Sequence, residues 1–375
     1  MTVPKPSLEL VRNVTDEHIL RALMRHRRMT RAELAVETGL SKPTAGESVR
    51  RLVAAGLVAD SGERTAGGRG RGRVGSYYTL AGGDRTAWAI SIAPGGVVAE
   101  AVDVYGETAG RAEEDAGRTA SSDQVATALR AVAERLAAAS GPAELAVVSA
   151  ADPVDRATGR LVHLPDAPFL VGDLDPAEVL APYVAGEVTV DNDVNWAARA
   201  ELAARPGSDT FAYLYLGEGL GCAIVSDGRV LRGRHGLAGE IAHLTTAGPG
   251  GGATPLIEVF GLLGLRRPGS TAIDVDRLLA AATGTGPRAA GVRAALGEAV
   301  RGALTAITSL ADPDHIIVGG PWGQDPAILT ALRDAAARHP RGPVLCPATV
   351  PAPSFAGVRA DALTRLRDGV IAAPR

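Results

Sequence analysis

The first sixty residues alternate between apolar and polar positions with the period of an α-helix. A first helix is predicted from about Thr15, and its apolar face consists of Ile19, Leu20, Leu23 and Met24. A short second helix follows, because Thr30 and Glu33 have the spacing of a capping box and Gly39 suits a helix end. Ser41 can cap a third helix, whose inward face is predicted to be Ala45, Val49, Leu52 and Val53.

Two short helices joined by a tight, glycine-containing turn have the spacing of a helix-turn-helix. On the third helix, the side chains predicted to point away from the apolar face and to reach DNA are Lys42, Thr44, Glu47, Arg50 and Arg51. Two short strands, "LVAD" and "SYYTL", follow this helix, and residues 59–76 are predicted to form a wing. The fold of residues 1–80 is therefore predicted to be a winged helix-turn-helix.

The predicted wing contains alternating glycines and arginines, "GRGRGR". Guanidinium groups on such a flat backbone can enter a narrow A·T-rich minor groove, and the arginines expected to do so are Arg69, Arg71 and Arg73. Taken alone, this segment is more typical of a solvated linker. Its position beside a capped helix-turn-helix favours DNA binding instead.

The pattern changes at residue 86, where strand and helix periods begin to alternate. Strands are predicted in "TAWAISIA", "GVVAEAVDVYG", "ELAVVSA" and "EVTVDND", with helices in "SDQVATALRAVAERLAAAS" and "VNWAARAELAA". A hairpin follows in "FAYLYLGEGLGCAIVSDGRVL", where Asp227-Gly228 is a turn signal. The remainder of the chain is therefore predicted to be an α/β body with mixed sheets.

Charge divides the chain at the same place. Residues 15–80 contain twelve Lys and Arg against seven Asp and Glu, a net charge of +5, whereas residues 81–375 carry −9 within an overall charge of −3. A basic N-terminal part on an acidic body is expected of a protein that presents one small domain to a polyanion. No apolar run is long enough to cross a membrane and the N-terminal residues do not resemble a signal peptide, so a cytoplasmic location without membrane contact is expected.

Two segments of the body contain candidate ligand-binding residues. Asn192 and Asp193 follow a predicted strand, where open α/β sheets place ligands, and Glu240 and His243 share a face if their segment is helical. Asn, Asp, Glu and His together suit the hydroxyl groups of a sugar. Each residue alone is more commonly a helix cap or a satisfied polar group, but the joint pattern favours a ligand site.

A third segment, "LADPDHIIVGG", has the shape of a turn that handles phosphate or nucleotide. A buried strand, Ile316-Ile317-Val318, runs into paired glycines. The two cysteines, Cys222 and Cys346, are far apart and have no metal-ligand spacing, so neither a disulfide framework nor a metal site is expected from them.

Taken together, these segments resemble the ROK family of repressors and sugar kinases. The similar segments are "TRAELAVETGLSKPT", "LPDAPFL", "DNDVNWAARAE", "LGEGLGCAIVSDGRVLRGRHGLAGEIAHL" and "DPDHIIVGG", and the resemblance covers about residues 12–372. It implies a two-lobed, actin-like ATPase (ribonuclease-H-like) body, with a small lobe at 85–188 plus about 355–375 and a large lobe at 189–354. It also implies sugar contacts from Asn192, Asp193, Glu240, His243 and Glu258, and assembly into homodimers or homotetramers.

The sequence departs from the kinases of this family at both phosphate-binding turns. An Asp-x-Gly-Gly-Thr-Lys turn is replaced by a segment with Ser91 and Pro94, which removes an acidic group and an N–H donor. The Gly-Thr-Gly turn reads Gly217-Glu218-Gly219, and a carboxylate there repels a triphosphate. The three cysteines that follow the zinc-binding His in the family are also missing after His243, so neither zinc nor any other cofactor is expected.

The sequence thus predicts a ROK-type transcriptional regulator that is not an enzyme, although the family's catalytic Asp persists as Asp193. Its expected partners are a double-stranded DNA operator and a sugar or sugar-like effector in the cleft between the lobes. Two alternatives stay open: a sugar kinase with an appended DNA-binding domain, and a DNA-binding regulator without a ligand.

Overall fold

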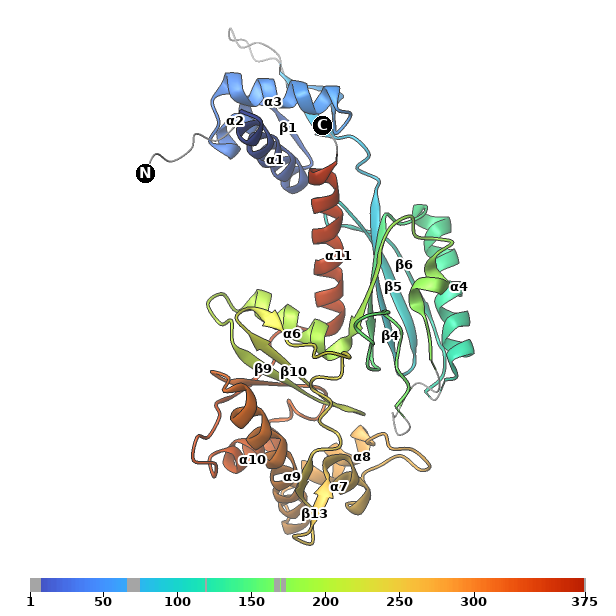
Figure 1. The fold of residues 1–375 in the computed structure, drawn as a ribbon, viewed down its shortest axis with the longest axis vertical. Helices are drawn as coiled ribbons and strands as arrows, with labels where there is room; N and C mark the ends of the chain where they lie inside the picture. The colour runs from blue at the N-terminus through green and yellow to red at the C-terminus, as the bar shows by residue number, and fades with distance from the viewer. Residues whose placement is uncertain (1–7, 66–74, 119, 165–168, 170–172, 374–375) are drawn as a thin grey trace.

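The structure is a computed structural model, which describes residues 8–65, 75–118, 120–164, 169 and 173–373. It has three parts: a small N-terminal domain at one end, a lobe built on one sheet, and a second lobe at the other end (Figure 1). The long C-terminal helix α11 (Pro353–Ala372) runs from the region between the lobes to the N-terminal domain.

The N-terminal domain is a winged helix. It consists of α1 (Leu8–His26), β1 (Arg28–Thr30), α2 (Arg31–Thr38), α3 (Lys42–Ala54), β2 (Val58–Arg64) and β3 (Ser76–Leu80), with the strands in the order β1-β3-β2. The local signals are confirmed: Thr30 and Glu33 form the capping box of α2, Gly39 ends that helix at a φ of 67°, and Ser41 caps α3.

The core of this domain shows one error in the predicted apolar faces. Ala45, Val49 and Leu52 of α3 are fully buried against α1, as expected, but Val53 is 41% exposed, so its assignment to the inward face is wrong. Buried Ser48 takes part in that face instead, because positions 45, 48, 49 and 52 centre on one side of a 3.6-residue helix and position 53 lies at its edge.

The first lobe contains a five-stranded sheet in the order β6-β5-β4-β7-β8. Its strands are β4 (Thr86–Ala93), β5 (Gly96–Asp103), β6 (Thr108–Glu114), β7 (Leu145–Ala150) and β8 (Val188–Asn192). The first three form an antiparallel meander, and β7 and β8 continue parallel to β4. Helix α4 (Ser122–Ser140) contacts β5 and β6, α11 contacts β4 and β7, and α5 (Pro176–Leu180) precedes β8.

The second lobe repeats this topology. Its strands are β9 (Phe211–Leu216), β10 (Leu220–Ser226), β11 (Arg229–Val230), β14 (Ile316–Gly319) and β15 (Leu345–Pro347), in the order β11-β10-β9-β14-β15. In both sheets the strands therefore follow the order third, second, first, fourth, fifth. This duplication is the ribonuclease-H-like architecture that the resemblance implied, and the predicted fold class is confirmed.

Helices complete the second lobe and join it to the first. Helices α9 (Pro287–Ala311) and α10 (Pro326–Ala336) pack on one side of its sheet, with α7 (Leu256–Leu262), α8 (Val275–Ala282) and the short hairpin of β12 (Thr245–Ala247) and β13 (Ala253–Pro255) nearby. Helix α6 (Asp193–Ala204) follows β8 and contacts β9 and β10 on one side and α11 on the other. The predicted lobe boundary at residue 189 falls inside β8, which pairs with β7 of the first sheet.

Helix α11 links the cleft region to the winged helix. Near its start, Gly357 packs so closely on α6 that an added Cβ would lie 2.3 Å from the carbonyl oxygen of Trp196. Near its end, Leu366 and Val370 join the hydrophobic core of the winged helix, and Asp368 forms an ion pair with Arg21 of α1 at 3.6 Å. The N-terminal domain is therefore packed on the same helix that packs on α6.

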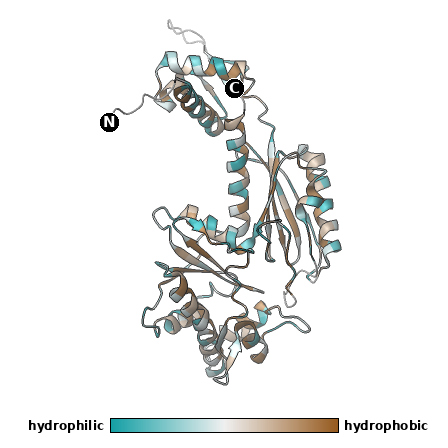
Figure 2. Ribbon diagram, viewed as in Figure 1, coloured by the Kyte–Doolittle hydropathy of each residue, from teal (hydrophilic) through white to brown (hydrophobic). Residues whose placement is uncertain are grey.

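The distribution of hydropathy agrees with this arrangement. The strands of the two central sheets are hydrophobic over most of their length, whereas α4 and α11 alternate between hydrophobic and hydrophilic positions (Figure 2). None of the helices in the described residues combines the length and the apolar character needed to cross a membrane.

Candidate ligand cleft and DNA-binding surface

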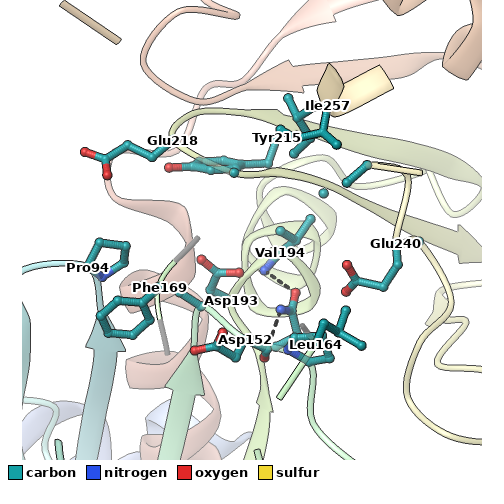
Figure 3. Close-up of a pocket in the computed structure, with 18 of the residues that line it drawn as sticks. Pro94, Asp152, Leu164, Phe169, Asp193, Val194, Tyr215, Glu218, Glu240 and Ile257 are labelled. Atoms are coloured by element: carbon teal, nitrogen blue, oxygen red, sulfur yellow. Dashed lines mark hydrogen bonds between the residues drawn. The ribbon is translucent and has the colours of Figure 1, made fainter. Parts of the chain in front are cut away.

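A cleft of about 480 Å³ lies between the lobes. The first lobe contributes residues from the ends of β4, β7 and β8, and the second contributes the turn between β9 and β10, the segment 236–243 and parts of 257–276. Asp193 lies near the middle of the cleft, and Glu218 and Glu240 lie at opposite ends (Figure 3). Four of the five predicted ligand residues line it: Asn192, Asp193, Glu240 and His243.

Asn192 and Asp193 are placed by the junction between β8 and α6. The Asn192 side chain accepts a hydrogen bond from the N–H of Val194 at 2.9 Å and so caps α6, while its amide nitrogen donates to the carbonyl oxygen of Asp152 at 3.2 Å. Asp193 is the first residue of the helix and lies where the helix dipole favours negative charge. Asn192 thus orients the start of α6, and Asp193 faces the cleft.

The carboxyl group of Asp193 titrates near neutral pH. Burial raises the pKa of Asp193 to about 7, with smaller contributions from the carboxylates of Asp152 and Glu240. Burial also raises the pKa of Glu240, opposed by the nearby His243. The Asp193 carboxyl group therefore accepts hydrogen bonds when it is ionised and can also donate one when it is protonated, and either form can pair with a hydroxyl of a polar ligand.

Glu240 and His243 reach the cleft from turns and not from a helix. The segment 233–243 contains turns, one bend and irregular residues but no helix, so a shared helical face does not explain their position. Gly239, at a φ of 99°, lies so close to β10 that a Cβ there would be 1.7 Å from the carbonyl oxygen of Cys222. The backbone of Gly239 also accepts a hydrogen bond from the N–H of Cys222 at 3.0 Å, which fixes the adjacent Glu240 beside the cleft.

The fifth predicted ligand residue, Glu258, lies elsewhere. Its side chain on α7 is 53% exposed and forms an ion pair with Arg266 at 2.9 Å, and it is not among the residues that line the cleft. Its neighbour Ile257 does line the cleft, because successive residues of a helix point in directions about 100° apart.

The end of the cleft around Glu218 contains an ionic cluster that joins the lobes. The Glu218 carboxylate forms ion pairs with Arg118 of the first lobe and, at 3.0 Å, with Arg267 of the second. Pro94, in the turn between β4 and β5, lines the same end, whereas Ser91 lies within β4 opposite Val98 and does not line the cleft. A negatively charged side chain is thus held at the position where a phosphate-binding turn was expected from the resemblance.

Packing inside the second lobe explains the glycines of "IIVGG". A Cβ at Gly319 would lie 2.0 Å from the hydroxyl oxygen of Tyr213, and one at Gly320, where φ is 84°, would lie 2.3 Å from the carbonyl oxygen of Leu216. Only glycine permits this close approach of β14 to β9. The paired glycines therefore have a structural role that needs no nucleotide.

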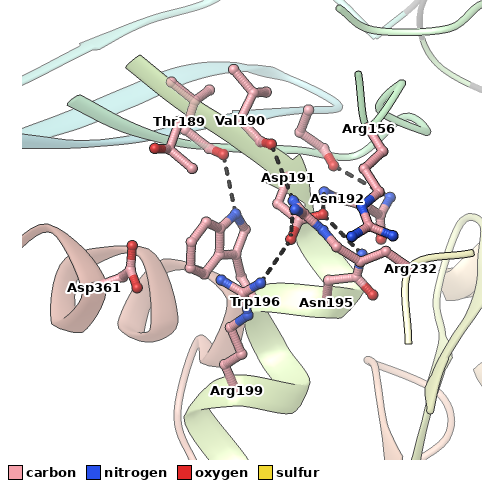
Figure 4. Close-up of polar contacts among 12 residues, drawn as sticks. Arg156, Thr189, Val190, Asp191, Asn192, Asn195, Trp196, Arg199, Arg232 and Asp361 are labelled. Atoms are coloured by element: carbon pink, nitrogen blue, oxygen red, sulfur yellow. Dashed lines mark hydrogen bonds and ion pairs between the residues drawn. The ribbon is translucent and has the colours of Figure 1, made fainter. Parts of the chain in front are cut away.

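A second ionic cluster lies where the chain crosses from one lobe to the other (Figure 4). The buried carboxylate of Asp191, on β8, forms ion pairs with Arg199 of α6 at 3.1 Å and with Arg232 of the second lobe at 2.5 Å. Asn195 donates a further hydrogen bond to it at 2.9 Å, and the Arg199 guanidinium stacks on Trp196. These contacts fix α6 relative to both sheets behind the cleft.

Several cleft residues were not predicted. Asp152, which is 2% exposed, follows β7 as Asp193 follows β8, so the rule that ligands lie beyond strand ends could have identified it. Arg118 and Arg267 are arginines of irregular segments and carry no local signal. Leu164 and Phe169 line the cleft from "LPDAPFL", the segment that the resemblance had indicated, and the neighbouring residues 165–168 lie outside the described part.

The residues after His243 do not fit a zinc ion. Residues 245–255 contain no Cys, His, Asp or Glu, and the segment is held instead by the pairing of β12 with β13 and by a hydrogen bond from the Thr246 hydroxyl to the carbonyl oxygen of Ala299. Within the described residues, no three His, Cys, Asp or Glu side chains lie close enough to share a metal ion.

The predicted DNA-contacting residues of α3 divide into two groups. Lys42, Thr44, Glu47 and Arg50 are exposed, with Arg50 and Glu47 paired at 2.7 Å. Arg51, in contrast, turns toward α1, where it pairs with the buried carboxylate of Asp16 at 2.6 Å. Arg51 thus stabilises the winged helix by joining α3 to α1. The predicted wing arginines Arg69, Arg71 and Arg73 lie outside the described residues.

A winged helix joined to a two-lobed, ribonuclease-H-like body with a polar cleft defines a class of protein, in which a helix-turn-helix domain is fused to a body with an actin-like ATPase fold. Comparison with known proteins gives the family. Residues 91–256 match the model of the ROK family, and residues 12–59 match that of winged helix-turn-helix DNA-binding domains. The chain therefore contains a ROK domain, matched over residues 91–256, preceded by a winged helix-turn-helix domain, as the sequence resemblance indicated.

Individual relatives agree with this assignment. A ROK family transcriptional regulator, described as a homologue of the Escherichia coli MLC protein, superposes with a TM-score of 0.61 at 20% identity, over 96% of this chain and 99% of that one. A ROK family glucokinase from Streptomyces griseus, in complex with glucose and AMPPNP, superposes with a TM-score of 0.55 at 24% identity, over 74% of this chain and 98% of the glucokinase. The bifunctional enzyme NanE/NanK of Brucella melitensis is 30% identical over 156 residues, which span 40% of this chain and 30% of that relative.

Proposed function

We propose that this protein is a transcriptional regulator that binds operator DNA through its winged helix and responds to a sugar or sugar-like effector in the cleft. It acts in the cytoplasm, where operator DNA is found, and it has no kinase activity. The observation that carries the proposal is the packing of α11 between α6, which begins at Asp193, and the winged helix. A ligand that moves α6 therefore also acts on the helix that supports the DNA-binding domain.

The DNA-binding part of the proposal rests on the exposed face of α3. Lys42, Thr44, Glu47 and Arg50 present one ammonium, one hydroxyl, one carboxylate and one guanidinium along a single helix. Such a set can contact both phosphates and base edges of a major groove. We further propose a homodimer or homotetramer, because two copies related by symmetry can bind two operator half-sites.

The sugar-binding part rests on the chemistry of the cleft. Asp193, Glu240, Asn192 and His243 offer carboxylate, amide and imidazole groups around one cavity. Hydroxyl groups of a sugar can donate to the carboxylates and accept from the amide and the imidazole. Since the carboxylates are costly to bury without partners, a hydroxyl-rich ligand that donates to them is favoured.

Phosphoryl transfer is the second candidate, because the carboxyl group of Asp193, with its pKa near 7, is suited to accept a proton. Phosphoryl transfer also requires groups that neutralise the triphosphate, and the corresponding end of the cleft contains the Glu218 carboxylate paired with two arginines. A coupled assay with ATP, magnesium and common hexoses or N-acetyl sugars separates the two candidates. Turnover above that of an Asp193→Ala variant would establish a kinase.

Regulation is tested with the full chain and an operator selected from random DNA by the purified protein. We expect at least one member of a broad sugar panel to change operator affinity, measured by fluorescence anisotropy at fixed salt. Asp193→Ala should abolish the response while leaving ligand-free DNA binding unchanged, and Asp155→Ala, an aspartate outside the cleft lining, should retain it. A panel without any effect would favour a regulator that uses no ligand.

A further inference from the structure

The cleft is larger than a single sugar ring requires. A hexose displaces about the volume of six water molecules, roughly 180 Å³ at ~30 Å³ each. The cleft measures about 480 Å³, and its carboxylates Glu240 and Asp193 occupy only one end and the middle (Figure 3). The other end, around Glu218, can therefore hold a second group of similar size.

The polar groups at the Glu218 end balance one another in charge. Arg118 and Arg267 contribute two positive charges, and Glu218 and Asp276 two negative ones, all on residues that line the cleft. Residues 271–276 lie beside Glu218, because the N–H of Ile273 donates to the carbonyl oxygen of Glu218 at 2.9 Å. A neutral occupant therefore binds without leaving a net charge uncompensated, whereas a phosphate group would add negative charge to a set of groups that is already balanced.

Rigid apolar surfaces lie beside these polar groups. The ring of Tyr215 packs against the turn between β9 and β10, since a Cβ at Gly217 would lie 2.6 Å from the ring. Pro94 and Pro321 line the same end from opposite lobes. Planar charged side chains next to aromatic and proline surfaces suit a sugar ring, which has hydroxyls at its edge and C–H groups on its faces.

We propose that the effector is a neutral disaccharide, with one ring at Asp193 and Glu240 and the second beside the cluster of Arg118, Glu218 and Arg267. This inference rests on the proposed function and extends it to the size and charge of the ligand. Arg118 belongs to the first lobe and Arg267 to the second, and both already share the Glu218 carboxylate. The second ring thus contacts both lobes at once, so it stabilises one lobe angle over others.

The proposal is tested by isothermal titration calorimetry on the full chain. The probes are maltose, cellobiose, lactose, sucrose, trehalose and N,N′-diacetylchitobiose, each compared with its component monosaccharides, and AMPPNP with magnesium. We expect one disaccharide to bind tenfold to roughly a hundredfold more tightly than its monosaccharides, as two or three added hydrogen bonds provide.

Arg118→Met should remove most of this preference and leave monosaccharide affinity within about twofold, because Arg118 is an exposed side chain at the second-ring end only. Arg135→Met is the matched control: Arg135 is also an exposed arginine of the first lobe, paired with Glu114, but it does not line the cleft. The control should behave as the unaltered protein.

Four results overturn the proposal, and they differ in what else they affect. Monosaccharides that bind as tightly as every disaccharide containing them refute the second subsite but leave the sugar-responsive regulator intact. A disaccharide preference that survives both Arg118→Met and Arg267→Met places the second ring elsewhere, and binding of AMPPNP assigns this end to a nucleotide. The absence of binding by any saccharide refutes the sugar effector itself, and the subsite with it.

Discussion

Replacing Asp193 with asparagine should stabilise the protein at neutral pH, by an amount that increases with pH. In the folded protein the pKa of this carboxyl group is raised from 3.8 to about 7, mainly by burial. Between these two values the folded state retains a proton that the unfolded state has already released. The wild-type protein therefore loses stability as the pH rises from about 4 through 7, whereas asparagine has no proton to lose.

The size of the effect follows from the shift. One pKa unit corresponds to about 1.4 kcal/mol, and a shift of about three units changes the free energy of unfolding by roughly 2 to 3 kcal/mol between pH 5 and pH 8. Asp193 is enclosed by the protein on most sides, but it lines the cleft and keeps part of its surface exposed there, so solvent screening reduces this value. We therefore expect the stabilisation by Asp193→Asn to grow by about 1 to 2 kcal/mol over this pH range.

Urea denaturation followed by tryptophan fluorescence measures this difference. The three tryptophans, Trp88, Trp196 and Trp322, all lie in the ROK body, so their signal reports on the lobes and not on the winged helix. Asp155→Asn is the control: hydrogen bonds from Thr158 lower the pKa of this exposed carboxyl group, so its effect should stay constant from pH 5 to pH 8. A constant difference for Asp193→Asn as well would show that Asp193 does not titrate near pH 7, and would refute the reasoning.

Three further predictions concern DNA and ligand binding. Arg50→Ala should weaken operator binding without lowering the stability of the winged helix. Arg51→Ala should destabilise that domain by about 2 to 3 kcal/mol, because it removes the guanidinium group that pairs with the buried Asp16 carboxylate; hydrogen exchange and DNA titration separate the two. Sugar affinity should fall as the pH drops below about 7, since protonated Asp193 loses an acceptor, and calorimetry at pH 5.5 and 8 checks this. Replacing the wing arginines Arg69, Arg71 and Arg73 with alanine should make the slope of log DNA affinity against log salt concentration less steep by up to about 3. An unchanged slope would show that these three arginines do not contact phosphates.

Two ionic clusters hold the lobes together, and they lie at different places relative to the cleft. Asp191, Arg199 and Arg232 lie behind the cleft, where the chain crosses between the sheets, and Arg118, Glu218 and Arg267 lie at one end of the cleft itself. The first cluster is buried around Asp191 and is poorly accessible to a ligand. The second lines the cavity, so it is the cluster that a ligand can rearrange.

The amino-acid sequence by itself determined the local elements of this protein. The capping box of Thr30 and Glu33, the Gly39 helix end and the Ser41 cap were all predicted, because each acts through hydrogen bonds between residues a few positions apart. Most strands of the two lobes were predicted from runs of apolar residues, although β6 and β15 were not. The segments shared with the ROK family indicated the architecture and four residues that line the cleft.

The tertiary structure alone decided which side chains meet. Arg51 was predicted to contact DNA but pairs with Asp16, which is 35 residues away in the chain, and Glu258 lies outside the cleft although Ile257 lines it. Glu218 pairs with two arginines that are distant in the chain: Arg118 is 100 residues away and Arg267 is 49 residues away. No local sequence pattern marks either arginine. Helical period and capping depend on near neighbours, whereas a cleft between two lobes depends on contacts across the whole chain, and these exist only once both sheets have formed and packed on α6.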